Sequence, residues 1–460
     1  MRTVIRGGTV VSGAGQAPAD VLVEGTRIAA LVEPGATIPG VARTVDASGA
    51  YVLPGTIDPH VHFNDEFMGT VSVHDYDHGT RAAAFGGVTT VIDFVNQGPR
   101  EPVTDAIARK KAEAEGAAFV DYGIHVALTD ASPATLDGIA AAVAQGVTSF
   151  KCYMTYREEG LLLEDHQIFA IMRAIAAAGG VTMIHAEDNT LLEARIAGLQ
   201  AEAATEPRDH LRSRPLSVED AAVRRVIELA EETAARLYVV HISSPAAVTM
   251  IREAAARGVD AYAETCTHFI AFDERMLDGS EGPLYICNPP LRDPGSARAI
   301  TDAVVRGRVD VVASDDAAYS YEAKHRHSHD FTRIPAGLPG VELRLPVLHD
   351  LVVSSGRMTM SALVGLVSEA PARIFGLSRK GRLLPGFDAD IAVFDPGERW
   401  TPAPGELHSP LSWGAYGGRE IRGRVRTVLS RGQVVVDGSS WHGIPGRGEF
   451  VVRSPSRGDR

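Results

Sequence analysis

A repeated alternation of strand-like and helix-like segments is the feature that most constrains the fold of this 460-residue chain. Apolar runs typical of buried strands recur between residues 51 and 314, and segments with the helical spacing of apolar residues separate most of them. The runs are Tyr51–Ile57, Thr89–Phe94, Tyr122–Ala127, Thr148–Tyr153, Val181–His185, Leu237–His241, Asp260–Thr265 and Val309–Ser314. About eight strand–helix repeats predict an α/β fold with a (β/α)8 barrel; the alternative is an open, doubly wound sheet.

The two ends of the chain follow another pattern. Residues 1–50 and residues 381–450 contain short strand-like segments joined by turns that carry Gly and Pro. We therefore expect one small β-sandwich built from both termini, with the barrel inserted between its halves. The expected division is residues 1–53 for the first part of the sandwich, 54–374 for the barrel, and 375–460 for the second part and a tail.

Composition and charge exclude several classes of protein. The net charge is −13 and no basic stripe is present, so nucleic acid is not an expected partner. No stretch approaches the roughly 18 apolar residues of a membrane span. An odd count of 3 cysteines argues against a disulfide framework and favours a reducing compartment. We expect a cytoplasmic protein that acts on a small molecule.

Polar side chains end several of the expected barrel strands. In a (β/α)8 barrel these ends meet at one rim, where catalytic groups lie. Side chains two positions apart on a strand point the same way, so His60 and His62 can face one place. Imidazoles and carboxylates are the ligands that divalent transition metals prefer. The residues that share this rim are His60, His62, Lys151, His185, His241 and Asp315.

Two features of this pattern leave alternatives open. A histidine at a strand end is often structural, and His325, His327 and His329 repeat the spacing in a polar segment with no strand before it. We interpret that segment as a solvated loop, with a metal-binding run or an active-site flap as the alternatives. Lys151 suits a salt bridge, a Schiff base, or a carbamate that bridges two metal ions.

A set of motifs in a fixed order resembles one family. "GTIDPHVH", "FKCYMTY", "IHAED", "VVHIS", "AETCTHF", "NPPLRD" and "ASDD" occur in this order, and "GRLLPGFDADIAVFDP" follows. The pattern is similar to the cyclic amidohydrolases, and "GTRAAAFGGVTTVIDF" and "IPAGLPGVELRLP" favour the dihydropyrimidinase–hydantoinase branch. The resemblance covers nearly the whole chain and implies a metal-bearing barrel with a β-sandwich.

The resemblance also implies a binuclear metal centre. His60, His62 and Asp315 would hold the more buried metal, and His185 and His241 the more exposed one. Lys151, carboxylated by CO2, would bridge the two. Zinc is the first expectation for both ions, although Mn, Co and Ni suit the same ligands.

Further residues take substrate roles by the same resemblance. The Tyr156 hydroxyl would face the substrate carbonyl, Asn288 would hold the ring through its main chain, and Asp315 would carry the proton. Ala336 would border the substrate, and Phe63 and Phe67 would either contact the side group of the ring or anchor their loop. Asp58 would either orient a ligand histidine or cap a turn.

Three departures from the family pattern bear on the substrate. Asp316 stands where relatives commonly have histidine, Ala336 stands where many have asparagine, and "AYSYEA" (residues 318–323) replaces the usual segment. The implied activity is the ring opening of a hydantoin or dihydropyrimidine to an N-carbamoyl amino acid by a hydroxide that bridges the metals. The alternatives are another ring, as in an allantoinase, lactamase or imidase, and a non-catalytic scaffold. The resemblance implies a homo-oligomer, a tetramer or a dimer.

Overall fold

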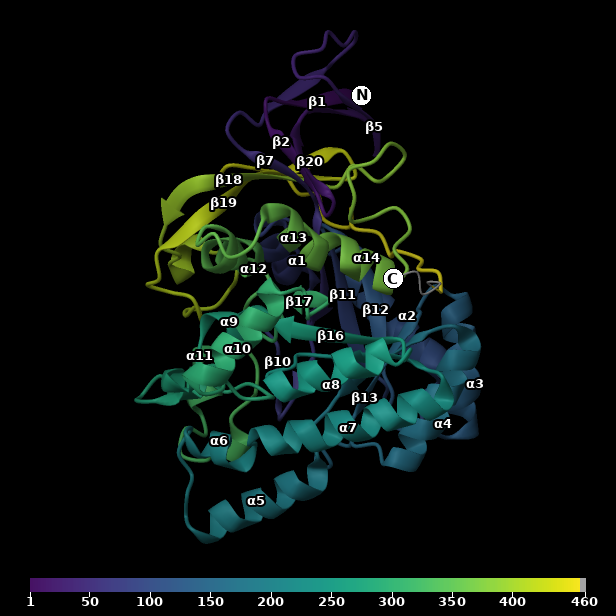
Figure 1. The fold of residues 1–460 in the computed structure, drawn as a ribbon, viewed down its shortest axis with the longest axis vertical. Coiled ribbons are helices and arrows are strands. Elements are labelled where there is room, and N and C mark those ends of the chain that lie inside the picture. The colour runs from purple at the N-terminus through teal and green to yellow at the C-terminus, as the bar shows by residue number, and fades with distance from the viewer. Residues whose placement is uncertain (456–460) are drawn as a thin grey trace.

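An eight-stranded parallel sheet forms the centre of the computed structural model, which describes residues 1–455 (Figure 1). Neighbouring strands follow one another in sequence, and hydrogen bonds join the two edges. The amide of His62 donates to the carbonyl of Asp316 (2.8 Å), and the amide of Asp316 donates to the carbonyl of His60 (3.3 Å). The predicted (β/α)8 barrel is therefore confirmed. Its strands are β8 (Thr56–Val61), β11 (Val88–Asn96), β12 (Asp121–Ala127), β13 (Ser149–Tyr153), β14 (Val181–His185), β15 (Arg236–Val239), β16 (Ala261–Cys266) and β17 (Val311–Ala313).

Helices between successive strands cover the outside of the barrel, and Figure 1 shows α7 and α8 lying beside each other across it. Local sequence explains where they begin: the Ser132 hydroxyl accepts from the Thr135 amide at the start of α3, and proline occupies the first turn. In α4, Ile168, Ile171, Met172 and Ile175 form the buried face. The helices are α1 (Tyr76–Phe85), α2 (Val103–Ala114), α3 (Pro133–Ala144), α4 (Asp165–Ala178), α7 (Leu216–Thr233), α8 (Pro245–Ala256) and α10 (Pro294–Val305).

Strands from the two chain ends share one sheet. Its order is β21-β20-β19-β18-β7-β2-β3, and β7 pairs antiparallel with β18 although more than 300 residues separate them. A second sheet, of order β5-β4-β1-β6, comes from the first part of the chain alone. The division into the three expected segments stays a prediction. The strands are β1 (Arg2–Arg6), β2 (Thr9–Ser12), β3 (Gly15–Pro18), β4 (Asp20–Glu24), β5 (Arg27–Val32), β6 (Arg43–Asp46), β7 (Tyr51–Pro54), β18 (Ile391–Trp400), β19 (Ile421–Ser430), β20 (Gln433–Asp437) and β21 (Ser440–Trp441).

The first expected barrel strand is two strands in the structure. β7 belongs to the terminal sheet and β8 to the barrel, with Gly55 between them. A Cβ at Gly55 would lie 2.1 Å from the Thr89 hydroxyl, so only glycine lets the chain pass at this junction. The prediction of one strand over Tyr51–Ile57 is therefore wrong. The residues on both sides of the glycine are apolar, so the sequence gives no sign that the chain passes there from the terminal sheet to the barrel.

Further helices and strands lie in the connections between the barrel strands and after the last of them. They are β9 (Glu66–Phe67), β10 (Thr70–Val71), α5 (Asn189–Ala201), α6 (Asp209–Ser213), α9 (Thr267–Ala271), α11 (Tyr321–His325), α12 (Arg344–Leu348), α13 (Met360–Val364) and α14 (Ala370–Ile374). Among residues 1–455, none of the helices is long and apolar enough to cross a membrane.

The C-terminal segment packs against the other end of the barrel strands. Phe450 lies beside Tyr122 in a parallel bridge. Arg453, 1% exposed, donates to the Ser149 hydroxyl (2.7 Å) and to the Ile124 carbonyl. Ser149 opens β13 at the end opposite Tyr153, so this arginine seals the floor of the barrel.

Candidate metal centre and active site

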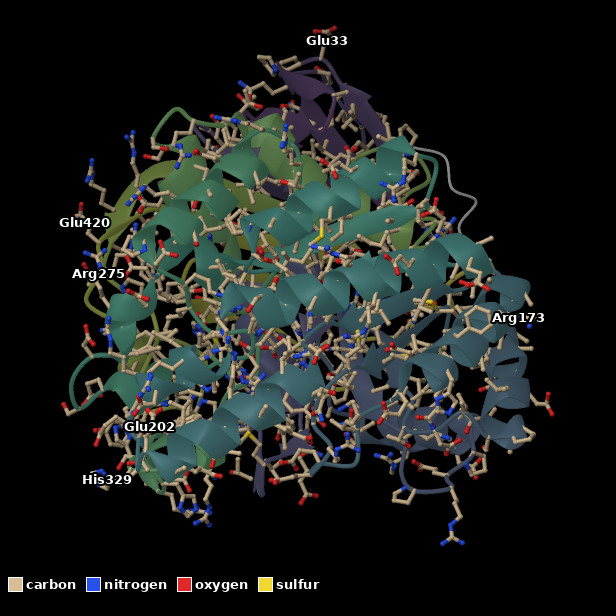
Figure 2. The ribbon with its side chains drawn as sticks, turned by 60° about the horizontal axis from the view of Figure 1, so that its bottom comes forward. Glu33, Arg173, Glu202, Arg275, His329 and Glu420 are labelled. Carbon is tan, nitrogen blue, oxygen red and sulfur yellow. The ribbon has the colours of Figure 1, made fainter. Side chains whose placement is uncertain are left out.

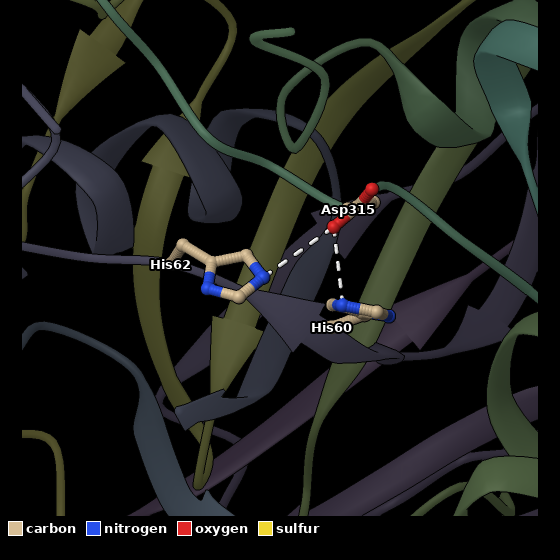
Figure 3. Close-up of side chains that lie close together, drawn as sticks. All are labelled: His60, His62 and Asp315. Carbon is tan, nitrogen blue, oxygen red and sulfur yellow. Dashed lines mark ion pairs between the residues drawn. The ribbon is translucent and has the colours of Figure 1, made fainter. Parts of the chain in front are cut away.

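Three of the predicted ligands meet at one point. Asp315 follows β17, and its Oδ1 lies 3.1 Å from His60 Nε2 and 3.5 Å from His62 Nε2 (Figure 3). Lys151, the middle residue of β13, places its Nζ 3.3 Å from the same His60 nitrogen. His60 and Lys151 come from strands β8 and β13, and His62 and Asp315 come from the loops that follow β8 and β17. The atoms named above face one another.

The other two histidines complete the group. The rings of His185 and His241 lie 4.5 Å apart, and the His241 ring is 5.5 Å from that of His60. His62, Lys151, His185, His241 and Asp315 line one cavity, with His60 buried against it. The barrel thus brings together all six side chains that the sequence placed on the rim.

Each of three histidines has one ring nitrogen held by a carboxylate. The distances are 2.6 Å from His60 Nδ1 to Glu264, 3.0 Å from His62 Nδ1 to Asp65, and 2.7 Å from His185 Nε2 to Glu187. A histidine that donates through one nitrogen presents the lone pair of the other. The remaining nitrogens are therefore available as ligands.

Sequence reasoning missed these three carboxylates as partners of the histidines. Glu187 stands two residues after His185, and Asp65 stands three after His62. An acidic residue close after a rim histidine could therefore have predicted these two pairs. Glu264 is 204 residues from His60, and no local pattern links the two. Glu264 also accepts from the His241 amide (3.0 Å) and the Tyr238 hydroxyl (2.7 Å).

Burial decides the charge of the nitrogen groups. It lowers the pKa of Lys151 to about 8, against the attraction of Asp315 and Glu264, so a neutral amine is accessible. Burial also lowers the pKa of His185, and burial together with His185 lowers the pKa of His241 well below its usual range. A neutral imidazole is the form that binds metal.

The carboxylates make the same place attractive to cations. Burial opposes ionisation of Asp315, yet His60 and His62 hold its pKa well below the usual range. Burial likewise opposes protonation of His62, yet hydrogen bonds to Asp315 and Asp65 raise its pKa to about 9. The neutral imidazoles of His185 and His241, the ionised Asp315, a buried amine that can be neutral and His62, which would release its proton to a bound cation, form a donor set that fits divalent transition metals.

Three residues of the site have left-handed backbone conformations. The φ angles are 67° at Tyr156, 37° at His241 and 51° at Asp315. Such a conformation costs about 1–3 kcal/mol at a non-glycine residue and persists only where the surroundings enforce it. The left-handed conformation turns the side chains of Tyr156, His241 and Asp315 into the cavity, at the end of the strand or loop that carries each of them.

The predicted substrate residues Tyr156, Asn288 and Ala336 line the same cavity. Burial raises the pKa of the Tyr156 phenol, so the hydroxyl stays protonated and can donate. The Asn288 Oδ1 is buried without a hydrogen-bond partner among the described residues. An unpaired acceptor in a cavity costs free energy unless a ligand donates to it.

Phe63 does not line this cavity, contrary to expectation. It is fully buried and packs edge-on against Tyr76, with their ring centroids 5.9 Å apart. A Cβ at Gly79 would lie 2.5 Å from its ring, so the glycine makes room for it. Phe67, the other phenylalanine expected near the side group, lines the cavity.

Two aspartates near the site hold structure together. Asp316 accepts from His74 Nδ1 (2.6 Å) and from the amides of Gly340 and Val341, and it does not line the catalytic cavity. Asp58 accepts from the amides of Ser314 (3.2 Å) and His60 (3.4 Å) and lies 3.5 Å from Arg344, whereas the His60 ring bonds Glu264 (2.6 Å).

The other histidine run lies away from the centre. His329 is exposed, and Figure 2 shows it at the outer edge of the molecule. His325 bonds the carbonyls of Tyr321 (3.0 Å) and Ser280 (3.1 Å). No metal-ligand group within the described part of the chain includes His325, His327 or His329.

Comparison with known proteins gives full-length relatives. Residues 51–435 match the amidohydrolase family. The chain is 37% identical over 461 residues to a D-hydantoinase of Streptomyces coelicolor, covering 98% of each chain, and 35% identical to a D-phenylhydantoinase of Escherichia coli, covering 99% of each. The crystal structure of a dihydropyrimidinase from Brevibacillus agri superposes with a TM-score of 0.97, at 34% identity and 100% coverage of both chains.

Proposed function

The chain belongs to the amidohydrolase family, in its hydantoinase and dihydropyrimidinase branch, and from this premise we propose that it opens a hydantoin or dihydropyrimidine ring to an N-carbamoyl amino acid. The observation that carries the proposal is the convergence of His60, His62, Lys151 and Asp315 beneath a cavity lined by Tyr156 and Asn288. A scaffold without catalysis has no need of this arrangement.

The proposal includes two divalent metal ions, zinc first, with Mn, Co and Ni as the alternatives. His60, His62 and Asp315 would hold one and His185 and His241 the other. The pKa of about 8 at Lys151 supports its carboxylation, because only a neutral amine adds CO2. When bound, the metals lower the pKa of a water molecule from 15.7 to about 7 and polarise the substrate carbonyl.

The residues of the chain supply the remaining steps. The ionised Asp315 accepts a proton from the attacking water and delivers it to the ring nitrogen as the C–N bond breaks. The Tyr156 hydroxyl donates to the carbonyl oxygen as negative charge develops there. The unpaired Asn288 Oδ1 accepts a ring N–H, in addition to the main-chain contact that the family implies.

The test is a ring-opening assay with purified, metal-loaded protein on hydantoin, dihydrouracil and allantoin, with chromatography of the products. We expect N-carbamoyl products from hydantoin or dihydrouracil and none from Asp315→Asn. Turnover of allantoin alone would move the enzyme to another branch, and no turnover of any ring would overturn the proposal.

Lys151→Ala tests the bridge between the metals. We expect the variant to lose metal and activity together, with partial rescue by added short carboxylic acids that replace the carbamate. Mass spectrometry measures the metal content of the variant. Full metal occupancy in Lys151→Ala would contradict the role of Lys151 as the bridge between the two ions.

We also propose a homo-oligomer, a tetramer or a dimer, in the cytoplasm. The family resemblance supports the oligomer. The three buried, unpaired cysteines support a reducing compartment. Light scattering of the purified protein measures the oligomeric state.

A further inference from the structure

A second, larger cavity adjoins the catalytic cavity and shares part of its wall. The outer cavity has a volume of about 760 Å³ and shares Asp65, Phe67, Asn96 and Leu161 with the catalytic cavity. A ring seated at the metal centre therefore has room to extend a side group past these four residues. This outer cavity deepens the proposed function and rests on it.

Acidic groups dominate the outer cavity. Two of its three basic residues are paired: Arg109 lies 3.0 Å from Glu101, and Lys110 lies 3.0 Å from Asp93. Glu66, Asp130 and Glu159 also line it, and the described structure shows no ion pair for any of them. Only Arg100 adds a positive charge without a paired carboxylate, so the cavity is net negative.

The passage between the cavities combines a carboxylate with aromatic rings. Asp65 lines both cavities; its Oδ2 lies 3.0 Å from His62 Nδ1, and its Oδ1 accepts from Asn96 Nδ2 (2.9 Å). Phe67 and Tyr156 stand edge to face at 5.1 Å, and Tyr153 and Tyr156 do so at 5.6 Å. Aromatic faces beside a carboxylate attract ammonium and guanidinium groups more than neutral or anionic ones.

The passage also offers unused hydrogen-bonding groups. Tyr153 is 5% exposed and Tyr319 is 1% exposed, and both line the catalytic cavity. Neither hydroxyl bonds another described residue, so both are available to a ligand at the cavity wall. A purely apolar side group would leave both unpaired, whereas a polar one can satisfy them.

We propose that the substrate is a cyclic ureide whose ring carries a side group ending in a cation, an ammonium or a guanidinium. The side group passes between Asp65 and the aromatic rings, and its charge lies in the acidic outer cavity. The product is then the N-carbamoyl derivative of a basic amino acid.

Three matched substrates test this proposal: the racemic hydantoins with the side groups of lysine, norleucine and glutamate. They differ mainly in terminal charge. We expect the lysine-derived ring to exceed the norleucine-derived ring by about tenfold or more in kcat/KM, with the glutamate-derived ring lowest. The ratio of kcat/KM between the lysine-derived and norleucine-derived rings should fall as salt is added, because salt screens exposed charges.

Variants locate the effect in the outer cavity. Glu66→Gln and Glu159→Gln should each lower the lysine-to-norleucine ratio of kcat/KM by about two- to fivefold, the range typical of exposed charges. Glu202→Gln is the matched control: Glu202 lies at the edge of the molecule in Figure 2, outside both cavities, and should leave the ratio unchanged.

The outcomes separate this inference from the proposed function. Equal or greater kcat/KM for the norleucine-derived ring, with unsubstituted hydantoin opened normally, overturns the cationic side group alone. A ratio that Glu66→Gln and Glu159→Gln leave unchanged also overturns it. Failure to open every ring, including unsubstituted hydantoin, overturns the proposed function and this inference with it.

Discussion

At the scale of single residues, the histidines proposed as ligands depend on carboxylates that hold their other ring nitrogens. Glu264 is fully buried and accepts three hydrogen bonds, from the His60 ring, the His241 amide and the Tyr238 hydroxyl. It therefore fixes the orientation of one ligand and the backbone of another. Outer partners of this kind commonly change metal affinity by about 10- to 100-fold.

Glu264→Gln should consequently weaken metal binding by about 10- to 100-fold while the fold persists. The amide can present its NH2 group to His60, which reverses the donor on the ring and turns the wrong tautomer towards the metal. Competition with a chelator, followed by metal analysis, measures the affinity. Glu253→Gln, an exposed change on α8, is the control. Equal affinities in both variants would refute the positioning role of Glu264.

Tyr156→Phe removes one hydroxyl from the cavity wall and leaves the ring contacts with Phe67 and Tyr153. We expect both metals to remain and kcat to fall by about 10²–10³, the usual cost of one donor to a developing oxyanion. Steady-state kinetics and metal analysis of one preparation check this. Tyr321→Phe, whose hydroxyl bonds Glu281 at the surface, is the control. An unchanged kcat would remove Tyr156 from the chemistry.

At the scale of elements, helix α11 is fastened to the substrate wall by a buried ammonium. Lys324 has no exposed surface and donates to the carbonyls of Ile286 and Pro335, both at 2.8 Å. These carbonyls lie close in sequence to Asn288 and Ala336, which line the cavity. No carboxylate pairs with Lys324 in residues 1–455, and burial lowers its pKa to about 7.

This lysine predicts a pH dependence of stability. Its pKa is lower in the folded than in the unfolded protein, so folding releases a proton, and its contribution improves as pH rises from about 7 towards 10.5. Below about pH 7 the penalty is fully present. The difference in unfolding free energy between wild type and Lys324→Met should therefore change by up to about 1.4 kcal/mol per pH unit.

Urea unfolding of both proteins at several pH values above 7 measures this difference. Comparison with Lys324→Met cancels the other groups that titrate in the same range. A difference that stays constant with pH would show that the ammonium carries no penalty in the folded state.

At the scale of the whole molecule, one lysine joins the barrel to the terminal sheet. Lys380 Nζ lies 2.5 Å from Asp121 at the start of β12, 2.6 Å from Asp390 and 3.1 Å from Asp388, the last two just before β18. The three carboxylates resemble a metal site in spacing, but the ammonium already occupies their centre. Burial raises the pKa of Asp390, and the charge of Lys380 acts in the opposite direction and lowers it.

Lys380→Met should destabilise the protein by about 3–5 kcal/mol, because the buried Asp390 loses its ion pair, while Asp121 and Asp388 keep Arg431 and Arg27. Calorimetry measures the loss, and the barrel and terminal sheet should then separate into distinct transitions. Arg379→Met is the control, since that side chain is 61% exposed and should change stability by less than about 0.5 kcal/mol. Equal effects of the two changes would contradict a clamp at Lys380.

Much of this architecture could be predicted from sequence because its signals are local. Strand–helix alternation predicts the barrel, and a polar residue at the end of an apolar run predicts the rim, as His185 and Asp315 illustrate. What could not be predicted depends on contacts between distant segments. Glu264 meets His60 across 204 residues, and the direction of Phe63 depends on the space that Gly79 leaves.

The arginine at the floor of the barrel sets an order of events during synthesis. Arg453 leaves the ribosome 304 residues after Ser149, to which it is bonded in the finished protein. Strands β12 and β13 are therefore synthesised long before the arginine that closes the base of the barrel beside them. A chain that ends before Arg453 lacks its hydrogen bonds to the Ser149 hydroxyl and the Ile124 carbonyl, and the base of the barrel stays unsealed.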